Sequence, residues 1–303
     1  MSPFIVGLVA VSGVLHVAWN VRLKTAGDPL RAATIGMLAA AVGIVPGGVV
    51  VWWLEGAATL PVEGVALGVA SGFVEAAYFI LLAAAYRRGD LSVVYPLARG
   101  TAPLLAVVIG VGLLNERLGQ AGSLGVVALL AGFLWLQRPW RALSLARHPT
   151  RPGASRRAAL DTAVPFALAT GVMIAAYTTI DRIGTRLIDP VPYAAILWAT
   201  CSIVLAVWVA FVAGGDLLRH GRDAARRAAV GGWLTLAAYL CILGALSVAP
   251  LSGVAPLRES ATVVAAAWGS VRMGEAADRA EVGRRVGASA LIVGGALLLA
   301  LGG

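Results

Sequence analysis

Long apolar runs, separated by short polar loops, extend over the whole chain. Seven runs contain no charged residue: 1–21, 32–54, 118–137, 162–180, 190–215, 228–257 and 286–303. Three more are apolar but include ionisable residues, namely 64–86 with Glu75, 91–115 with Arg99, and 252–271 with Arg258 and Glu259. A helix of about 20 apolar residues crosses the hydrocarbon core of a bilayer. The pattern therefore predicts an all-α membrane protein with ten transmembrane helices.

The composition excludes a soluble fold. Hydrophobic residues make up 59% of the 303 residues and charged residues only 13%, whereas soluble domains have about 45–50% and about 25%. The same apolar content excludes intrinsic disorder. The first run has no basic segment before it and no small-residue cleavage site after it, so we expect a retained helix rather than a signal peptide.

Charge is distributed as expected for a membrane protein. The net charge is +9, and 23 of the 24 basic residues are Arg. Loops on one side of the predicted helices carry 19 of them, and the other side carries only Arg117, Arg182 and Arg186. The positive-inside rule then predicts a multi-pass protein of the cell (inner) membrane, with linker 139–160 in the cytoplasm and both termini outside. We expect the lipid bilayer as a partner and no nucleic acid.

The chain contains an internal repeat. Residues 71–96 align without gaps to 231–256, and at nearly the same offset Arg99 meets Arg258 and Glu116 meets Glu275. This predicts a first repeat at 1–138, the Arg- and Pro-rich linker, and a second repeat at 161–303. Each repeat holds five spans, an odd number, so the second is inverted relative to the first. Inverted repeats place a substrate site near the membrane midplane, where the two halves meet.

These segments together resemble the EamA family of the drug/metabolite transporter superfamily. The similarity lies in LHVAWNVRLKTAGDP (15–29), AAYTTIDRIG (175–184), YPLARGTAPLLA (95–106), APLRESATVVAA (255–266), NERLG (115–119) and GEAADR (274–279). The resemblance implies a ten-helix secondary transporter of small metabolites, often an exporter of amino acids or related compounds. Better-known members are drawn with both termini in the cytoplasm, the opposite of what the Arg count predicts here.

Two arginines inside the predicted spans are the first candidates for substrate binding. Arg99 and Arg258 follow Pro96 and Pro256, where a helix can bend and free backbone groups. A guanidinium binds carboxylate or phosphate through two parallel hydrogen bonds, so the pair could clamp an anion. The alternatives are internal ion pairs with Glu75 or Glu259, or extension of the side chains to the membrane interface.

Carboxylates inside the spans are the candidates for proton coupling. Glu75 shares a helix face with Tyr78, three residues further on, and could carry a proton or bind substrate. It could equally be a structural partner of an arginine. Glu259 and Asp181 are further proton-coupling candidates, as is His16, for which a role as a satisfied core histidine is the alternative.

Aromatic and small polar residues predict a cavity wall. In the first span Trp19 and Asn20 lie close to His16, and Tyr177 with Asp181 repeats this spacing in the sixth span. Such residues suit a ligand with an apolar body and a polar end, although polar side chains also join helices within membrane bundles. Further lining candidates are Tyr95, Trp198 and Tyr239.

Several residues are expected to have structural roles. Glu116 and Glu275 follow their spans and are expected to cap or pair at the interface. Glycine-rich faces on the fifth and tenth spans suit close helix packing, so these spans are assigned to scaffold or to a dimer contact. A monomer and a homodimer are both open. The glycines are Gly125, Gly132, Gly287, Gly294 and Gly295.

The sequence contains no HExxH, GxSxG, Walker or CxxC motif, and its three His residues are scattered. We therefore expect no enzyme, no catalytic residue, no metal and no cofactor. The leading hypothesis is a secondary transporter, with export expected, of a small anionic or zwitterionic metabolite such as an amino acid. The alternative is a flippase or transporter of a phosphate-bearing lipid or sugar-linked metabolite. A membrane-embedded enzyme or receptor is the rival outside transport.

Overall fold

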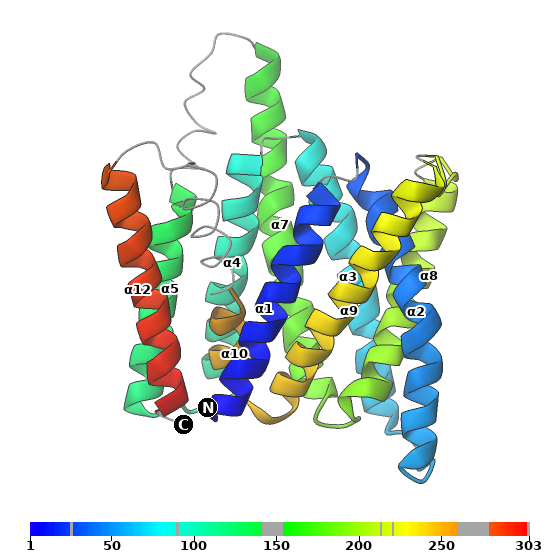
Figure 1. Ribbon diagram of the computed structural model, residues 1–303, viewed down its shortest axis with the longest axis horizontal. Coiled ribbons are helices and arrows are strands. Elements are labelled where there is room, and N and C mark those ends of the chain that lie inside the picture. The colour runs from blue at the N-terminus through cyan, green and yellow to red at the C-terminus, as the bar shows by residue number, and fades with distance from the viewer. Residues whose placement is uncertain are drawn as a thin grey trace.

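The computed structural model describes residues 1–24, 27–88, 91–140, 154–212, 214–219, 221–259 and 279–301. Within these ranges the regular structure is ten helices and no strand (Figure 1). The helices are α1 (Pro3–Lys24), α2 (Pro29–Leu54), α3 (Val62–Arg88), α4 (Leu91–Gly112), α5 (Gln120–Gln137), α7 (Ala154–Gly184), α8 (Pro190–Phe211), α9 (Arg222–Val248), α10 (Leu251–Glu259) and α12 (Arg279–Leu301). The prediction of an all-α protein is confirmed for the described residues.

Five helices are long and apolar enough to cross a bilayer: α2, α3, α8, α9 and the Ala163–Gly184 part of α7. Shorter apolar stretches of 10–17 residues lie in α1, α4, α5 and α12. The ninth predicted span is described only as far as Glu259. The helical membrane-protein class therefore agrees with the structure, whereas ten crossings and the domain boundaries stay predictions.

Aspartate-proline pairs start two of the long helices. The Asp28 carboxylate caps α2 by accepting a hydrogen bond from the backbone N–H of Arg31 at 3.2 Å, and Asp189 caps α8 through Val191 N–H at 3.1 Å. The proline that follows each aspartate has no N–H to leave unsatisfied and has the φ of a first helical residue. Local sequence therefore determines where both helices begin.

Helices distant in sequence pack side by side. α3 packs on α7 and α8, α9 packs on α1 and α2, and α2 also packs on α8. α5 and α12 form a separate pair at one edge of the bundle in Figure 1. The start of α1 and the end of α12 lie at the same edge of the molecule (Figure 1), where the Met1 amino group donates to the Leu299 carbonyl at 2.8 Å.

Large apolar side chains cover much of the outer surface. Phe211 is 85% exposed, Val42 77% and Phe4 74%. Exposure of so many apolar groups to water would be unfavourable, whereas their contact with equally apolar lipid tails is not. The surface therefore agrees with a protein embedded in a membrane.

Glycines at the helix crossings allow backbones to meet. A Cβ placed on Gly232 of α9 would lie 2.0 Å from the carbonyl oxygen of Gly36 in α2, and one on Gly72 of α3 would lie 2.8 Å from the carbonyl oxygen of Leu197 in α8. Gly72 and Gly232 are the positions that match in the sequence repeat. Each therefore occupies a close crossing with a neighbouring helix.

α5 and α12 pack against each other through the glycine-rich faces that the sequence predicts. A Cβ on Gly125 would lie 2.7 Å from the carbonyl oxygen of Gly295, and one on Gly132 would lie 2.8 Å from that of Ala288. Close packing is thus confirmed for these positions and is directed at the partner helix of the same chain. A Cβ on Gly294 would meet nothing within 4 Å, so Gly294 does not contribute to this close packing within the chain.

We predict that Gly232→Ala destabilises the protein by about 1–3 kcal/mol, because the added methyl group can be accommodated only if α9 and α2 separate. Gly231→Ala is a matched control at the neighbouring position, since its Cβ would meet nothing within 4 Å. This control should retain or slightly raise stability through the helix propensity of alanine. Thermal unfolding in detergent measures both, and equal midpoints for the two variants would contradict the close crossing.

Candidate functional site

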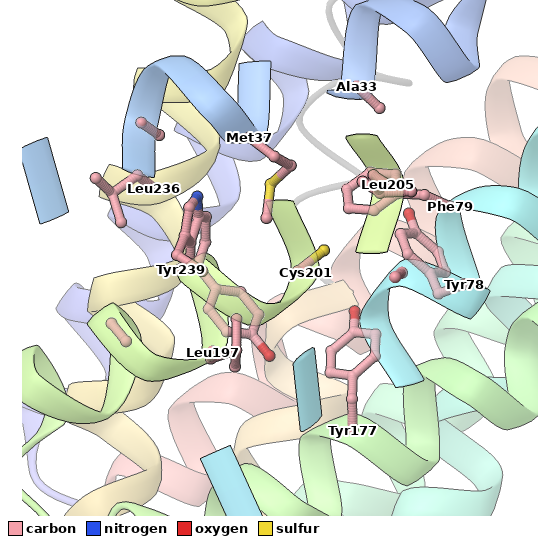
Figure 2. Packing of buried hydrophobic residues seen from close by; sticks show 14 of the residues in the cluster. Ala33, Met37, Tyr78, Phe79, Tyr177, Leu197, Cys201, Leu205, Leu236 and Tyr239 are labelled. Atoms are coloured by element: carbon pink, nitrogen blue, oxygen red, sulfur yellow. The ribbon is translucent and has the colours of Figure 1, made fainter. Parts of the chain in front are cut away.

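A chain of aromatic rings lies in the centre of the helix bundle. Ring centroids are 5.8 Å apart for Tyr78 and Tyr177, 6.0 Å for Tyr177 and Tyr239, and 5.5 Å for Tyr239 and Trp198. All four side chains are buried, and they come from α3, α7, α9 and α8. Figure 2 shows the three tyrosines in one packed cluster with Cys201 of α8. The predicted cavity-wall residues Tyr78, Tyr177, Trp198 and Tyr239 thus lie together.

The carboxylate of Asp181 joins four helices. Its Oδ1 accepts hydrogen bonds from Ser71 of α3 at 2.5 Å and from the Tyr193 hydroxyl of α8 at 2.9 Å, and its Oδ2 accepts one from the Tyr239 hydroxyl of α9. Asp181 itself is on α7 and is 0% exposed. Three O–H donors suit an ionised carboxylate, which can only accept. The protein itself therefore supplies hydrogen-bond donors to both carboxylate oxygens of Asp181.

Glu75 is buried next to this network but differs from Asp181 in its hydrogen bonding. It is 3% exposed, one helical turn after Ser71, and within electrostatic range of both Asp181 and Arg258. Among the residues that the structure describes, its Oε2 atom has no hydrogen-bond partner. The structure thus places two of the candidate carboxylates close together with unequal hydrogen bonding.

The two candidate arginines are both buried inside the bundle. Arg99 is 5% exposed and contacts His16 Nε2, while Trp19 Nε1 donates to His16 Nδ1 at 3.1 Å. Arg258 is 9% exposed, and its Cζ lies 5.4 Å from the centroid of the Tyr239 ring. Both arginines are thus enclosed by protein rather than exposed on the outer surface. His16 has a partner on each ring nitrogen, which fits the satisfied core histidine.

Each arginine lines a narrow cleft. Arg99, with Tyr78 and Thr170, borders a cleft with a cavity volume of only about 10 Å³, and Arg258, with Thr178, borders another of about 10 Å³. Ile174 of α7 lines both clefts. Ile174 is therefore a wall residue common to both clefts.

Outside this cluster, Glu116 attaches the loop after α4 to the start of α10. Its carboxylate accepts hydrogen bonds from the backbone N–H of Leu251 at 2.7 Å and from that of Ser252 at 2.9 Å, and from the Ser252 hydroxyl at 2.7 Å. Arg182 Nε lies 3.3 Å from Glu116, and its Nη1 donates to the Leu246 carbonyl at 2.8 Å. The prediction that Glu116 caps or pairs is confirmed.

Arg182 corrects the sequence interpretation. It was expected in an exposed loop, but it lies within α7 and is 7% exposed. The Glu116 carboxylate, 66 residues earlier in the chain, compensates its charge. Arg182 thus takes part in a structural ion pair with Glu116 and is not a charge on a loop.

Sequence reasoning also missed Ser71 and Tyr193, which donate to Asp181. A signal existed for Ser71, since it precedes Glu75 by one helical turn on the same face. The side chains of Asn20, Tyr95 and Glu259, and the whole of Glu275, lie outside the described residues. Among the described residues, no three His, Cys, Asp or Glu side chains gather as a metal site would require.

Comparison with known proteins supports the fold. No family model matches the chain, and no curated protein matches it. A solved structure described only as "Crystal structure of protein" is similar, with a TM-score of 0.65 and 20% sequence identity over 98% of this chain and 96% of that one. At this identity the likeness concerns the fold alone, and it extends over nearly all of both chains.

We predict that Asp181→Asn lowers the unfolding midpoint, because charge-assisted hydrogen bonds weaken and one amide N–H₂ must face hydroxyl groups. The expected cost is about 1–3 kcal/mol. Asp189→Asn is the control, since asparagine caps a helix as well as aspartate does and Asp189 is exposed. Thermal unfolding in detergent compares them, and an unchanged midpoint for Asp181→Asn would mean that the network does not hold the helices together.

Proposed function

We propose that the protein is a secondary transporter of the EamA type that exports a small anionic or zwitterionic metabolite, such as an amino acid, by alternating access. The observation that carries this proposal is the pair of buried arginines, Arg99 and Arg258, each lining its own cleft beside the aromatic cluster. Charged groups in an apolar bundle are costly, so they mark substrate pathways more often than scaffold.

The helix pairings support two inverted repeats. If the second five helices repeat the first, α7 corresponds to α1 and α9 to α3. The pairing of α1 with α9 then corresponds to that of α7 with α3, and both pairings occur. The repeat-matched glycines Gly72 and Gly232 likewise contact corresponding helices, α8 and α2. Such exchange is expected of a pseudo-two-fold arrangement, in which one half rocks against the other.

The Glu116–Arg182 contact supports alternating access. Glu116 belongs to the first repeat, whereas Arg182 and the start of α10 belong to the second. The interaction therefore crosses between halves that would have to move relative to one another. Breaking it would free the end of the bundle where α10 begins.

We predict that Arg99→Gln and Arg258→Gln each weaken binding of the transported anion about tenfold or more, because a charged hydrogen bond contributes about 1.5–3 kcal/mol. Arg117→Gln is the control, since Arg117 is exposed. A thermal-shift screen of amino acids and organic acids identifies a ligand. The flux of this ligand into proteoliposomes is then compared between the wild-type protein and the variants. Folded Arg99 and Arg258 variants with wild-type affinity would overturn the proposal.

The orientation of the chain in the membrane provides a second test of the proposal. We predict that both termini face outward and that the linker is cytoplasmic, because 19 of the 24 basic residues lie on the linker side. The contact between Met1 and Leu299 supports a common side for the two ends. A terminal tag should be cleaved by protease added to intact cells, whereas a tag at position 150 should be protected. Protection of both terminal tags would reverse the assignment.

A further inference from the structure

Two neighbouring carboxylates in the central cluster have unequal hydrogen bonding. Asp181 accepts from three hydroxyl groups, which occupy both of its oxygens. Glu75 is buried to nearly the same degree, yet within the described part of the chain its Oε2 has no donor. A buried acceptor without a donor is unfavourable unless something else occupies it during function. Glu75 is therefore available to a ligand, whereas Asp181 is not.

The surroundings of Glu75 favour a cation. Tyr78 lies on the same face of α3, and the rings of Tyr177 and Tyr239 continue the cluster. Ring faces attract ammonium and guanidinium groups, and the Tyr239 ring already has the Arg258 guanidinium 5.4 Å from its centroid. The cluster thus holds a positive group in its present state.

α8 contributes two further buried polar atoms. Trp198 Nε1 and Ser202 Oγ are spaced i, i+4 on one face of α8, and neither has a hydrogen-bond partner among the described residues. Trp198 packs on Tyr239, and Cys201 of the same helix turn is within electrostatic range of Glu75. An indole N–H can only donate, so it requires an acceptor on the ligand. A ligand with both an ammonium N–H donor and an oxygen acceptor would satisfy all three atoms.

We propose that Glu75 and the ring faces of Tyr78 and Tyr177 form a subsite for the ammonium group of the substrate. The substrate is then a zwitterion, with a primary or methylated ammonium at Glu75 and its anionic group toward Arg99 and Arg258. This inference rests on the proposed transport function and deepens it, because it selects zwitterions over simple organic anions. Trp198 and Ser202 then donate hydrogen bonds to an oxygen of that same anionic group.

A shape-matched pair of probes tests the subsite. Glycine betaine and 3,3-dimethylbutanoate carry the same carboxylate, but the trimethylammonium of the first is replaced by a neutral tert-butyl group in the second. Titrations of the purified full chain, followed by thermal shift and calorimetry, give both dissociation constants. We expect betaine to bind at least tenfold more tightly, because its positive charge is attracted by the Glu75 carboxylate and the ring faces, whereas the tert-butyl group is neutral.

Variants assign this preference to Glu75. Glu75→Gln should reduce the betaine preference to less than twofold. Glu63→Gln, which alters an exposed carboxylate on the same helix, should keep the wild-type preference. If Glu75→Gln does not fold, Tyr78→Leu replaces it, since loss of the ring face should reduce betaine binding selectively.

The outcomes separate this inference from the proposed function. If both probes bind wild-type protein equally, or if Glu75→Gln keeps the betaine preference, the ammonium subsite is wrong while anion transport stands. If wild-type protein binds neither probe, the subsite is also wrong. The arginine variants and the amino- and organic-acid panel then decide the transport proposal independently.

Discussion

The carboxylate of Asp181 is the interaction on which the centre of the molecule depends. It is fully buried in an apolar bundle, so every hydrogen bond it needs must come from the protein. The donors come from Ser71 on α3, Tyr193 on α8 and Tyr239 on α9, which fixes these three helices around α7. A chain with few charged residues thereby obtains a polar centre with a defined geometry.

That centre is not symmetric, although the sequence repeat is. Arg99 and Arg258 are repeat-matched, yet Arg99 contacts His16 whereas Arg258 lies over the Tyr239 ring near two carboxylates. The two halves therefore offer different surroundings to one bound molecule. A ligand with unlike ends fits such surroundings better than one with like ends, which agrees with the proposed ammonium subsite.

Hydropathy alone identified Arg99, Arg258, Glu75 and Asp181 as unusual, because a charge inside an apolar run is costly wherever it lies. The Asp28-Pro29 and Asp189-Pro190 pairs likewise mark the observed helix starts. Ser71 and Tyr193 could not be identified this way, since hydroxyl groups in apolar runs are common and their partners are distant in sequence. Arg182 was misassigned for the same reason, because its burial depends on Glu116, a residue from the other repeat.

The short helix α10 connects these features. Its first backbone N–H groups donate to Glu116, and a carboxylate at a helix N-terminus is further stabilised by the helix dipole. Arg258 lies about two helical turns further along α10, beside Tyr239. The described part of α10 therefore links the contact at Glu116 to Arg258, so a displacement of Arg258 along the helix axis would also act on that contact. Under the proposed alternating access, α10 would thereby couple occupation of the central site to release of the Glu116–Arg182 contact.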